Sequence, residues 1–286
     1  MGKNADQKVS EVDEIKLIYH EILNGYSFDV ISSFFVKHFS EKENYLLLKK
    51  RMELFYFYSN QGVPHESELL KRAIDNGDWT PEKEDQILEL KYLISDNEKN
   101  LANIIPQQRS MIEKIIDTKK NELHEILYDR KHTLGRNIED LVDEDINDYI
   151  SYLSFYKDEK CLVPVESDYE TFLNWEPDKV AELNISLSNH YSKFSEDAIK
   201  GAACMPFFLN KFSYAKDNFY IFLGKPINEF THHQSLLFSM GARNIGVLQT
   251  AKGSPPDLTL DAKIADVVRW YDLQHSLEIG RRNKEE

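Results

Sequence analysis

The sequence feature that most constrains the fold is a pair of long amphipathic stretches within residues 79–135. Thr80 and Pro81 are typical of a helix start, because threonine caps the first turn and proline fits the first helical position. Apolar residues then recur at helical spacing in a first series: Ile87, Leu90, Ile94 and Leu101. A second series follows Pro106 and ends before Gly135: Ile112, Ile116, Leu123 and Ile126. The pattern predicts an antiparallel helical hairpin joined within residues 103–107. It has too few unbroken heptads to require a long dimeric coiled coil.

The first 78 residues predict a bundle of three helices. Ser10 with Asp13 and Ser40 with Glu43 have the spacing of helix N-caps, and Ser27 is a cap for the helix between them. The apolar faces of the second and third helices are Phe28, Ile31, Phe35 and Phe39, then Tyr45, Leu48, Met52 and Phe55. The aromatic residues 55–58 are expected in the core or at an interface; the alternative is a platform on which bases stack.

The C-terminal part predicts a small mixed domain. Ser195 opens a helix that Pro206 limits, and residues 219–223 predict a short strand. Thr231 and Gln234 form a capping box at the start of a helix. Gly241 is predicted to end that helix. A linker at Ser254–Asp257 leads to a final helix, predicted to end at Gly280, whose apolar face is Ile264, Val267, Val268 and Tyr271.

These elements together predict a mainly α protein with an N-terminal helical bundle, a long hairpin, a small mixed α(+β) C-terminal domain and a terminal amphipathic helix. We expect four segments: an N-terminal helical segment (1–78), the hairpin (79–135), an acidic connecting region (136–182) and the C-terminal domain with its final helix (183–286).

Charge argues against nucleic acid as a partner. The chain has 35 Lys and Arg against 49 Asp and Glu, a net charge of −14, and phosphate binding needs the opposite excess. Residues 136–182 hold 14 acidic and four basic side chains, whereas residues 200–253 hold six basic and two acidic ones. This asymmetry suggests electrostatic complementarity within the chain or between copies. The alternative is a solvated acidic face that aids solubility.

The sequence also predicts a cytoplasmic protein, in the host cytoplasm or the virion if it is viral. No apolar run reaches the roughly 18 to 20 residues of a spanning helix, so no membrane contact is expected. Residues 1–13 lack the apolar stretch of a secretory signal. Cys161 and Cys204 are too few for a disulfide framework, which favours a reducing compartment.

No motif for catalysis, a metal or a cofactor emerges, and the sequence predicts a non-enzymatic protein. Adjacent His232 and His233 point about 100° apart on a helix, so they cannot readily share an ion. The carboxylates at 143–148 lack the glycine of a calcium loop. Gly224–Lys225 lacks the remaining residues of a phosphate-binding loop. Cys204 is expected to be a buried thiol.

The segment from Ala202 to Gln249, AACMPFFLNKFSYAKDNFYIFLGKPINEFTHHQSLLFSMGARNIGVLQ, precedes the Pro255–Pro256–Asp257 linker and a helix with Trp270 and Tyr271. This order resembles small helical tail-assembly or virion-associated proteins of tailed bacteriophages. The resemblance covers about a third of the chain. It implies that the protein binds other structural proteins, as a chaperone or a component, without turnover, and it carries over no catalytic residue.

Two functions follow as hypotheses. The first is an interaction or assembly protein whose partners are other proteins, itself included, and whose aromatic anchors are Phe207, Phe208, Phe222 and Trp270, with core packing as the alternative role of these residues. The second is an inhibitor or regulator whose acidic segment 136–182 occupies a basic groove of a nucleic-acid-handling partner, imitating nucleic acid charge.

Overall fold

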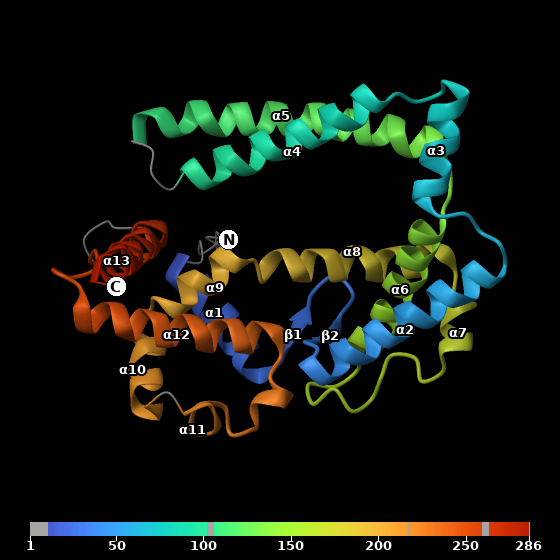
Figure 1. Cartoon of the computed structure of the whole chain (residues 1–286). Coiled ribbons are helices and arrows are strands. Elements are labelled where there is room, and N and C mark those ends of the chain that lie inside the picture. The colour runs from blue at the N-terminus through green and yellow to red at the C-terminus, as the bar shows by residue number, and fades with distance from the viewer. Residues whose placement is uncertain (1–10, 102–105, 217, 259–262, 286) are drawn as a thin grey trace, which may run out of the picture. The chain divides into compact units, whose positions relative to one another are not determined.

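The computed structural model describes residues 11–101, 106–216, 218–258 and 263–285 (Figure 1). The described residues are mainly helical, with 13 α-helices and a small three-stranded antiparallel sheet near the N-terminus. The prediction of a mainly helical protein is confirmed. The chain divides into two compact units, unit 1 (residues 1–48 and 147–286) and unit 2 (residues 49–146). This grouping differs from the four segments expected above, because unit 1 joins both ends of the chain.

Unit 2 contains helices α3 (Glu66–Asn76), α4 (Pro81–Leu101) and α5 (Pro106–Leu134). Helices α2 (Glu41–Asn60) and α6 (Ile138–Ser154) each begin in one unit and end in the other. The remaining elements belong to unit 1: α1 (Glu11–Asn24), β1 (Tyr26–Asp29), β2 (Phe34–Lys37), β3 (Phe155–Tyr156), α7 (Tyr169–Leu173), α8 (Pro177–Lys193), α9 (Glu196–Ala203), α10 (Pro206–Ala215), α11 (Phe219–Leu223), the 3-10 helix η1 (Ile227–Glu229), α12 (His232–Thr250) and α13 (Ile264–Glu285).

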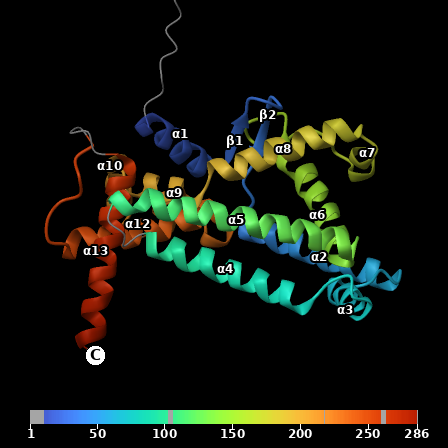
Figure 2. The same cartoon turned by 90° about the horizontal axis from the view of Figure 1, so that it is seen from above.

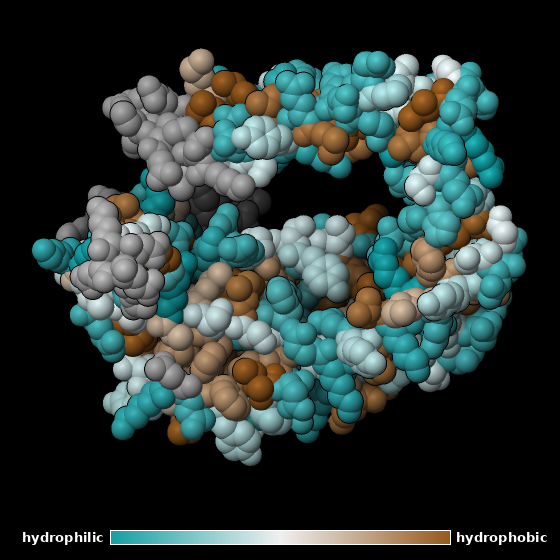
Figure 3. All heavy atoms as spheres, viewed as in Figure 1, coloured by the Kyte–Doolittle hydropathy of each residue, from teal (hydrophilic) through white to brown (hydrophobic). Residues whose placement is uncertain are grey.

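The helical hairpin of unit 2 is present as predicted. Helices α4 and α5 run side by side in both views, and their polar and apolar side chains alternate over the surface (Figures 1, 2 and 3). Pro81 and Pro106 are the first residues of the two helices, and Gly135, with φ of 73°, follows the second. The joint lies partly outside the described residues, which omit 102–105. Helix α3, which the sequence analysis does not predict, closes the same core.

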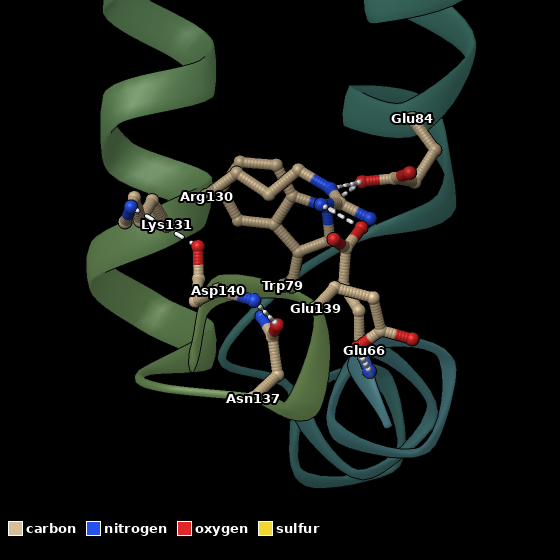
Figure 4. Close-up of polar contacts among 8 residues, drawn as sticks. All are labelled: Glu66, Trp79, Glu84, Arg130, Lys131, Asn137, Glu139 and Asp140. Atoms are coloured by element: carbon tan, nitrogen blue, oxygen red, sulfur yellow. Dashed lines mark hydrogen bonds and ion pairs between the residues drawn. The ribbon is translucent and has the colours of Figure 1, made fainter. Parts of the chain in front are cut away.

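The core of unit 2 is small and ends in a polar junction. One cluster of it consists of the buried residues Ala73, Trp79, Ile87 and Leu134. Beside them, Arg130 on α5 donates from Nε to Glu84 on α4 at 2.6 Å and from Nη1 to Glu66 on α3 at 2.6 Å (Figure 4). The indole N–H of Trp79 also donates to Glu84, at 2.8 Å. One guanidinium therefore connects three helices.

The prediction of a second helix after Ser27 is wrong. Residues 26–37 form the β1–β2 hairpin, in which Phe28 pairs with Phe35, and β2 then pairs with β3. Asp29 organises the turn by accepting hydrogen bonds from the backbone N–H and the hydroxyl of Ser32, and Ser33 has a φ of 59°. Aromatic residues pack well on a pleated strand, which explains why an apparent helical spacing forms strands here.

The core of unit 1 is built on α9, which packs between α1 and α13. A Cβ atom at Gly201 of α9 would lie 3.1 Å from Ile15 of α1 and 3.1 Å from Ile264 of α13. The helix starts at Ser195 and Thr231 are confirmed, since Ser195 accepts from the N–H of Ala198 and Thr231 forms a complete capping box. The apolar face of α13 is buried, as predicted: Ile264, Val267 and Tyr271.

Three further predictions for unit 1 are wrong. Residues 219–223 form α11 and not a strand, because Asn218 caps the N–H groups of Tyr220 and Ile221. Gly241 lies inside α12 and does not end it. Its lack of a side chain leaves room for the rings of Phe208 and Phe212 on α10. Gly280 likewise lies inside α13, which continues to Glu285.

Candidate functional site

The proposed aromatic anchors lie in or against the core of unit 1. Phe208 and Phe222 are buried and contact each other edge-on, with ring centroids 5.7 Å apart, so the expectation that they are exposed anchors is corrected. Phe207 and Trp270 are partly buried against the same cluster. Burial gives these four residues a packing role, the alternative that their sequence left open.

Helix α2 carries the exposed aromatic surface instead. None of its residues is buried, and Tyr56 and Phe57 are 62% and 54% exposed, so residues 55–58 do not form a buried core, and the expectation of an interface stays a prediction. A stripe along three turns has the spacing of one helix face, and each member is more than half exposed: Tyr45, Leu48, Met52 and Tyr56. We call these four residues the α2 stripe. Because the stripe lies on one continuous helix, helix periodicity alone sets its geometry.

The acidic residues at the start of α6 are bound to groups within unit 2. Asp140 pairs with Lys131 at 3.1 Å, and Glu139 accepts from the backbone N–H of Glu66 at 3.0 Å (Figure 4). Asp145 accepts from the hydroxyl of Tyr58 at 2.6 Å. Two further ion pairs join Asp143 to Arg51 and Glu144 to Arg136. Three of the five carboxylates at the start of α6, Asp140, Asp143 and Glu144, are therefore ion-paired within unit 2.

Unit 1 holds a cavity of about 620 Å³ that sequence analysis does not predict. Three separate segments of the sequence line it: residues 24–46, which run from the end of α1 into the start of α2, the loop after β3, and the segment between α11 and α12. Its charged side chains are Lys37, Lys42, Glu43, Lys160, Lys225 and Glu229. Lysine is the more abundant charge on this wall, although the chain as a whole is strongly acidic.

His38 lines this cavity and is 4% exposed. Neither of its ring nitrogens has a hydrogen-bond partner among the described residues. The ring packs against His190, His233 and Phe194, with centroids 4.8, 5.1 and 4.7 Å away. Ser27 Oγ lies 2.7 Å from Nδ1 of His190. We call His38, His190 and His233 the histidine cluster.

Burial keeps the histidine cluster neutral. Desolvation, reinforced by the neighbouring rings, holds the pKa of His38 well below its ordinary value. Desolvation also lowers the pKa of His190 to about 3 and that of His233 to about 4. A neutral imidazole donates from one nitrogen and accepts at the other, so the buried His38 ring leaves one donor and one acceptor unused within the cluster.

The cations around the cavity differ in their surroundings. Lys37 forms an ion pair with Glu43, whereas Lys42, Lys160 and Lys225 take part in no ion pair among the described residues. Burial lowers the pKa of Lys225, and its ammonium lies 5.9 Å from the ring centroid of Phe230. A desolvated cation of this kind gains more from a bound anion than a hydrated one does.

Both cysteines are protonated thiols. Cys161 lines the cavity, and partial burial raises its pKa to about 11. Cys204 is buried, as predicted, and burial raises its pKa to about 12. Nucleophilic thiol chemistry requires the thiolate, so neither side chain is prepared for it. Within the part of the chain that the structure describes, no group of three or more His, Cys, Asp or Glu side chains is arranged to hold a metal ion.

The signals that could have located this cavity are weak in the sequence. His38, His190 and His233 are separated by more than 40 residues at each step, and the lysines lie on three segments. Only the fold brings them together.

Comparison with known proteins finds no matching family model, no matching curated protein and no matching solved structure. Over the residues that the structure describes, none of the helices has the length and apolar character needed to cross a membrane.

Proposed function

We propose that this chain is a non-enzymatic interaction protein that acts in assembly through protein–protein contacts. The exposed α2 stripe is the observation that carries the proposal. Tyrosine and methionine are enriched where proteins meet, and a row of such side chains on one helix face forms a ready contact surface. Methionine adds the flexibility that lets a surface adapt to a partner.

A second copy of this chain is the partner that we propose for the stripe. Lys49 and Glu53 lie beside it on one flank, 4.0 Å apart, and both are more than half exposed. When two α2 helices pack antiparallel, the same flank of each faces the other, so Lys49 of one copy lies opposite Glu53 of the next. The surface is then self-complementary, as a two-fold interface requires.

The first test is the mass of the purified protein by light scattering over a range of concentrations. We expect the mass to rise from the 33.5 kDa monomer toward twice that value. The double substitution Met52→Glu with Tyr56→Glu is expected to keep the protein monomeric, because it places charge in the middle of the contact. Tyr214→Glu, at a residue that is 87% exposed on α10, is the matched control and is expected to leave association unchanged.

A charge exchange tests the antiparallel geometry. Lys49→Glu alone is expected to weaken the dimer by placing like charges opposite each other, and adding Glu53→Lys is expected to restore it. A wild-type protein that stays monomeric at every concentration contradicts the proposal. A dimer that survives both stripe substitutions assigns the contact to another surface.

A role among the assembly or virion-associated proteins of tailed bacteriophages belongs to the same proposal. Its support is the order of segments from Ala202 onward, and an assembly role agrees with a self-complementary surface. The inhibitor hypothesis has less support, because the carboxylates at the start of α6 already pair with Arg51, Lys131 and Arg136. A decoy for a basic groove needs these charges free.

A further inference from the structure

The lysine-lined cavity of unit 1 takes no part in the proposed assembly role. Its volume of about 620 Å³ falls within the range of roughly 300 to 1,000 Å³ typical of small-molecule sites. Its wall combines polar side chains and backbone from three segments far apart in the sequence. Such convergence gives a site whose groups are held in place by the fold.

The first observation that points to a ligand is the convergence of polar groups on the cavity. Besides its charged side chains, the wall includes Asn24, Ser40 and Asn228. A few polar groups that converge on one volume are typical of a small-molecule site. His38 also lines the cavity, but both of its ring nitrogens are buried within the histidine cluster, so we assign them no ligand contact.

The second observation is charge. Four lysines line the cavity against two glutamates, and Glu43 already pairs with Lys37. Lys225 is partly buried and forms no ion pair among the described residues; Glu229 and Glu43 act on its ammonium at longer range, and the effect of desolvation outweighs theirs. The local field therefore favours an anion although the protein as a whole carries a net charge of −14.

The number of cations favours phosphate over carboxylate. Each lysine presents one compact point charge, and a phosphate monoester offers three oxygens and nearly two negative charges to several such cations, whereas a carboxylate offers two oxygens and one charge. Among the described residues that line the cavity, every permanent cation is a lysine.

We propose that this cavity binds a small molecule that carries a phosphate group. Lys225, Lys42 and Lys160 attract the phosphate oxygens, and Asn24 and Asn228 are the polar side chains of the wall that a second polar group of the same molecule meets. The inference is independent of the assembly proposal, because it rests on the cavity and not on the α2 stripe.

The test is isothermal titration calorimetry of the full chain with inorganic pyrophosphate as the probe. Lys225→Met is expected to weaken binding at least tenfold, since it removes a desolvated charge and keeps the shape of the side chain. Lys211→Met is the matched control, because Lys211 also lies over an aromatic ring, 5.3 Å from the centroid of Phe222, but does not line the cavity. This control is expected to leave binding unchanged.

Lys42→Met provides a second test at an exposed side chain of the cavity wall. It is expected to leave the thermal midpoint unchanged and to weaken the binding of pyrophosphate severalfold, because it removes one of the positive charges. Absence of pyrophosphate binding overturns the proposal, as does equal binding by the Lys225→Met and Lys211→Met variants. Tighter binding of citrate than of pyrophosphate overturns the assignment to phosphate.

Discussion

Gly241 of α12 lies against the ring of Phe212 on α10, where a Cβ atom added at Gly241 would stand 2.8 Å from ring carbon Cδ2. It would also stand 2.7 Å from Cζ of Phe208. Real Cβ atoms do not approach other atoms this closely, so the glycine is needed for the two helices to pack. Glycine is a weak helix former, which is why the sequence alone predicts that the helix ends at Gly241.

The first prediction compares two glycines of α12. Gly241→Ala is expected to destabilise the protein by about 1–3 kcal/mol, because the added methyl group forces the Phe208 and Phe212 rings to shift. Gly246→Ala meets no atom within 4 Å and is expected to stabilise it by about 0.5–1 kcal/mol through helix propensity. Urea denaturation measures both values. Equal shifts for the two variants would show that α10 and α12 do not pack in this way.

The second prediction concerns the junction of unit 2. The Arg130 side chain is 16% exposed and binds Glu66 and Glu84. Arg130→Met is expected to cost about 1–3 kcal/mol, since it leaves two carboxylates without their cation in a partly buried place. Lys120→Met removes a comparable pair with Glu98, but both of those side chains are about half exposed, and we expect a change below about 0.5 kcal/mol.

The free energy of unfolding, measured by thermal unfolding and urea titration, distinguishes the Arg130→Met variant from the Lys120→Met variant. A loss for Arg130→Met no larger than that for Lys120→Met would contradict the junction that Figure 4 shows. Hydrogen exchange adds a local reading, because the amide groups at the start of α4 are expected to lose protection in the Arg130 variant alone.

Local signals predicted the helices that have caps. Ser195 and the Thr231–Gln234 box each satisfy orphan backbone groups at a helix start through nearby residues, so their effect is visible in a short stretch of sequence. Predictions failed where a distant contact decides the structure. Phe28 pairs with Phe35 and Phe35 pairs with Tyr156 of β3, so these residues form strands. The role of Gly241 is clear only when Phe212 is known to lie beside it.

The candidate sites were less predictable than the fold. An amphipathic stripe such as that of α2 predicts a helix and an apolar face but does not say whether another element covers that face. The cavity draws His38, Lys160 and Lys225 from segments more than 60 residues apart, and none of these segments carries a motif. Burial, which makes His38 unusual, is a property of the folded chain alone.

The third prediction is a loss of stability at mildly acidic pH. The pKa values of His190 and His233 are about 3 and about 4 in the folded chain, below the ordinary value of 6.5. The unfolded chain therefore binds more protons between pH 6.5 and 4, so the free energy of unfolding falls as pH is lowered through this window. We expect a loss of roughly 1–2 kcal/mol per histidine between pH 7 and pH 5.

His190→Asn is expected to flatten this pH dependence, because it removes a titrating ring while asparagine keeps a partner for Ser27. His232→Gln is the matched control, since His232 is exposed beside His233, and it is expected to leave the slope unchanged. The measurement is the urea midpoint at half-unit steps of pH. A wild-type midpoint that is constant from pH 7 to pH 5 would contradict the burial of the cluster.

The fourth prediction concerns Gln234, which connects the start of α12 to the end of α1. Its side-chain amide donates to the carbonyl groups of Ile22 at 2.8 Å and Leu23 at 3.1 Å, and its oxygen accepts from the N–H of Thr231. Gln234→Met keeps the volume but leaves these buried groups without partners, so we expect a loss of about 2–3 kcal/mol. Thr231→Ala removes the hydroxyl cap alone and is expected to cost about 1 kcal/mol.

The double variant distinguishes a shared network from two separate contacts. Because both residues form one capping box, the double variant is expected to lose less stability than the sum of the losses of the two single variants. Ser195→Ala, at the cap of α9, is the control whose effect is expected to add fully to that of Gln234→Met. If Gln234→Met costs no more than Thr231→Ala, the bonds to Ile22 and Leu23 contribute little, and the link between α1 and α12 rests on apolar packing alone.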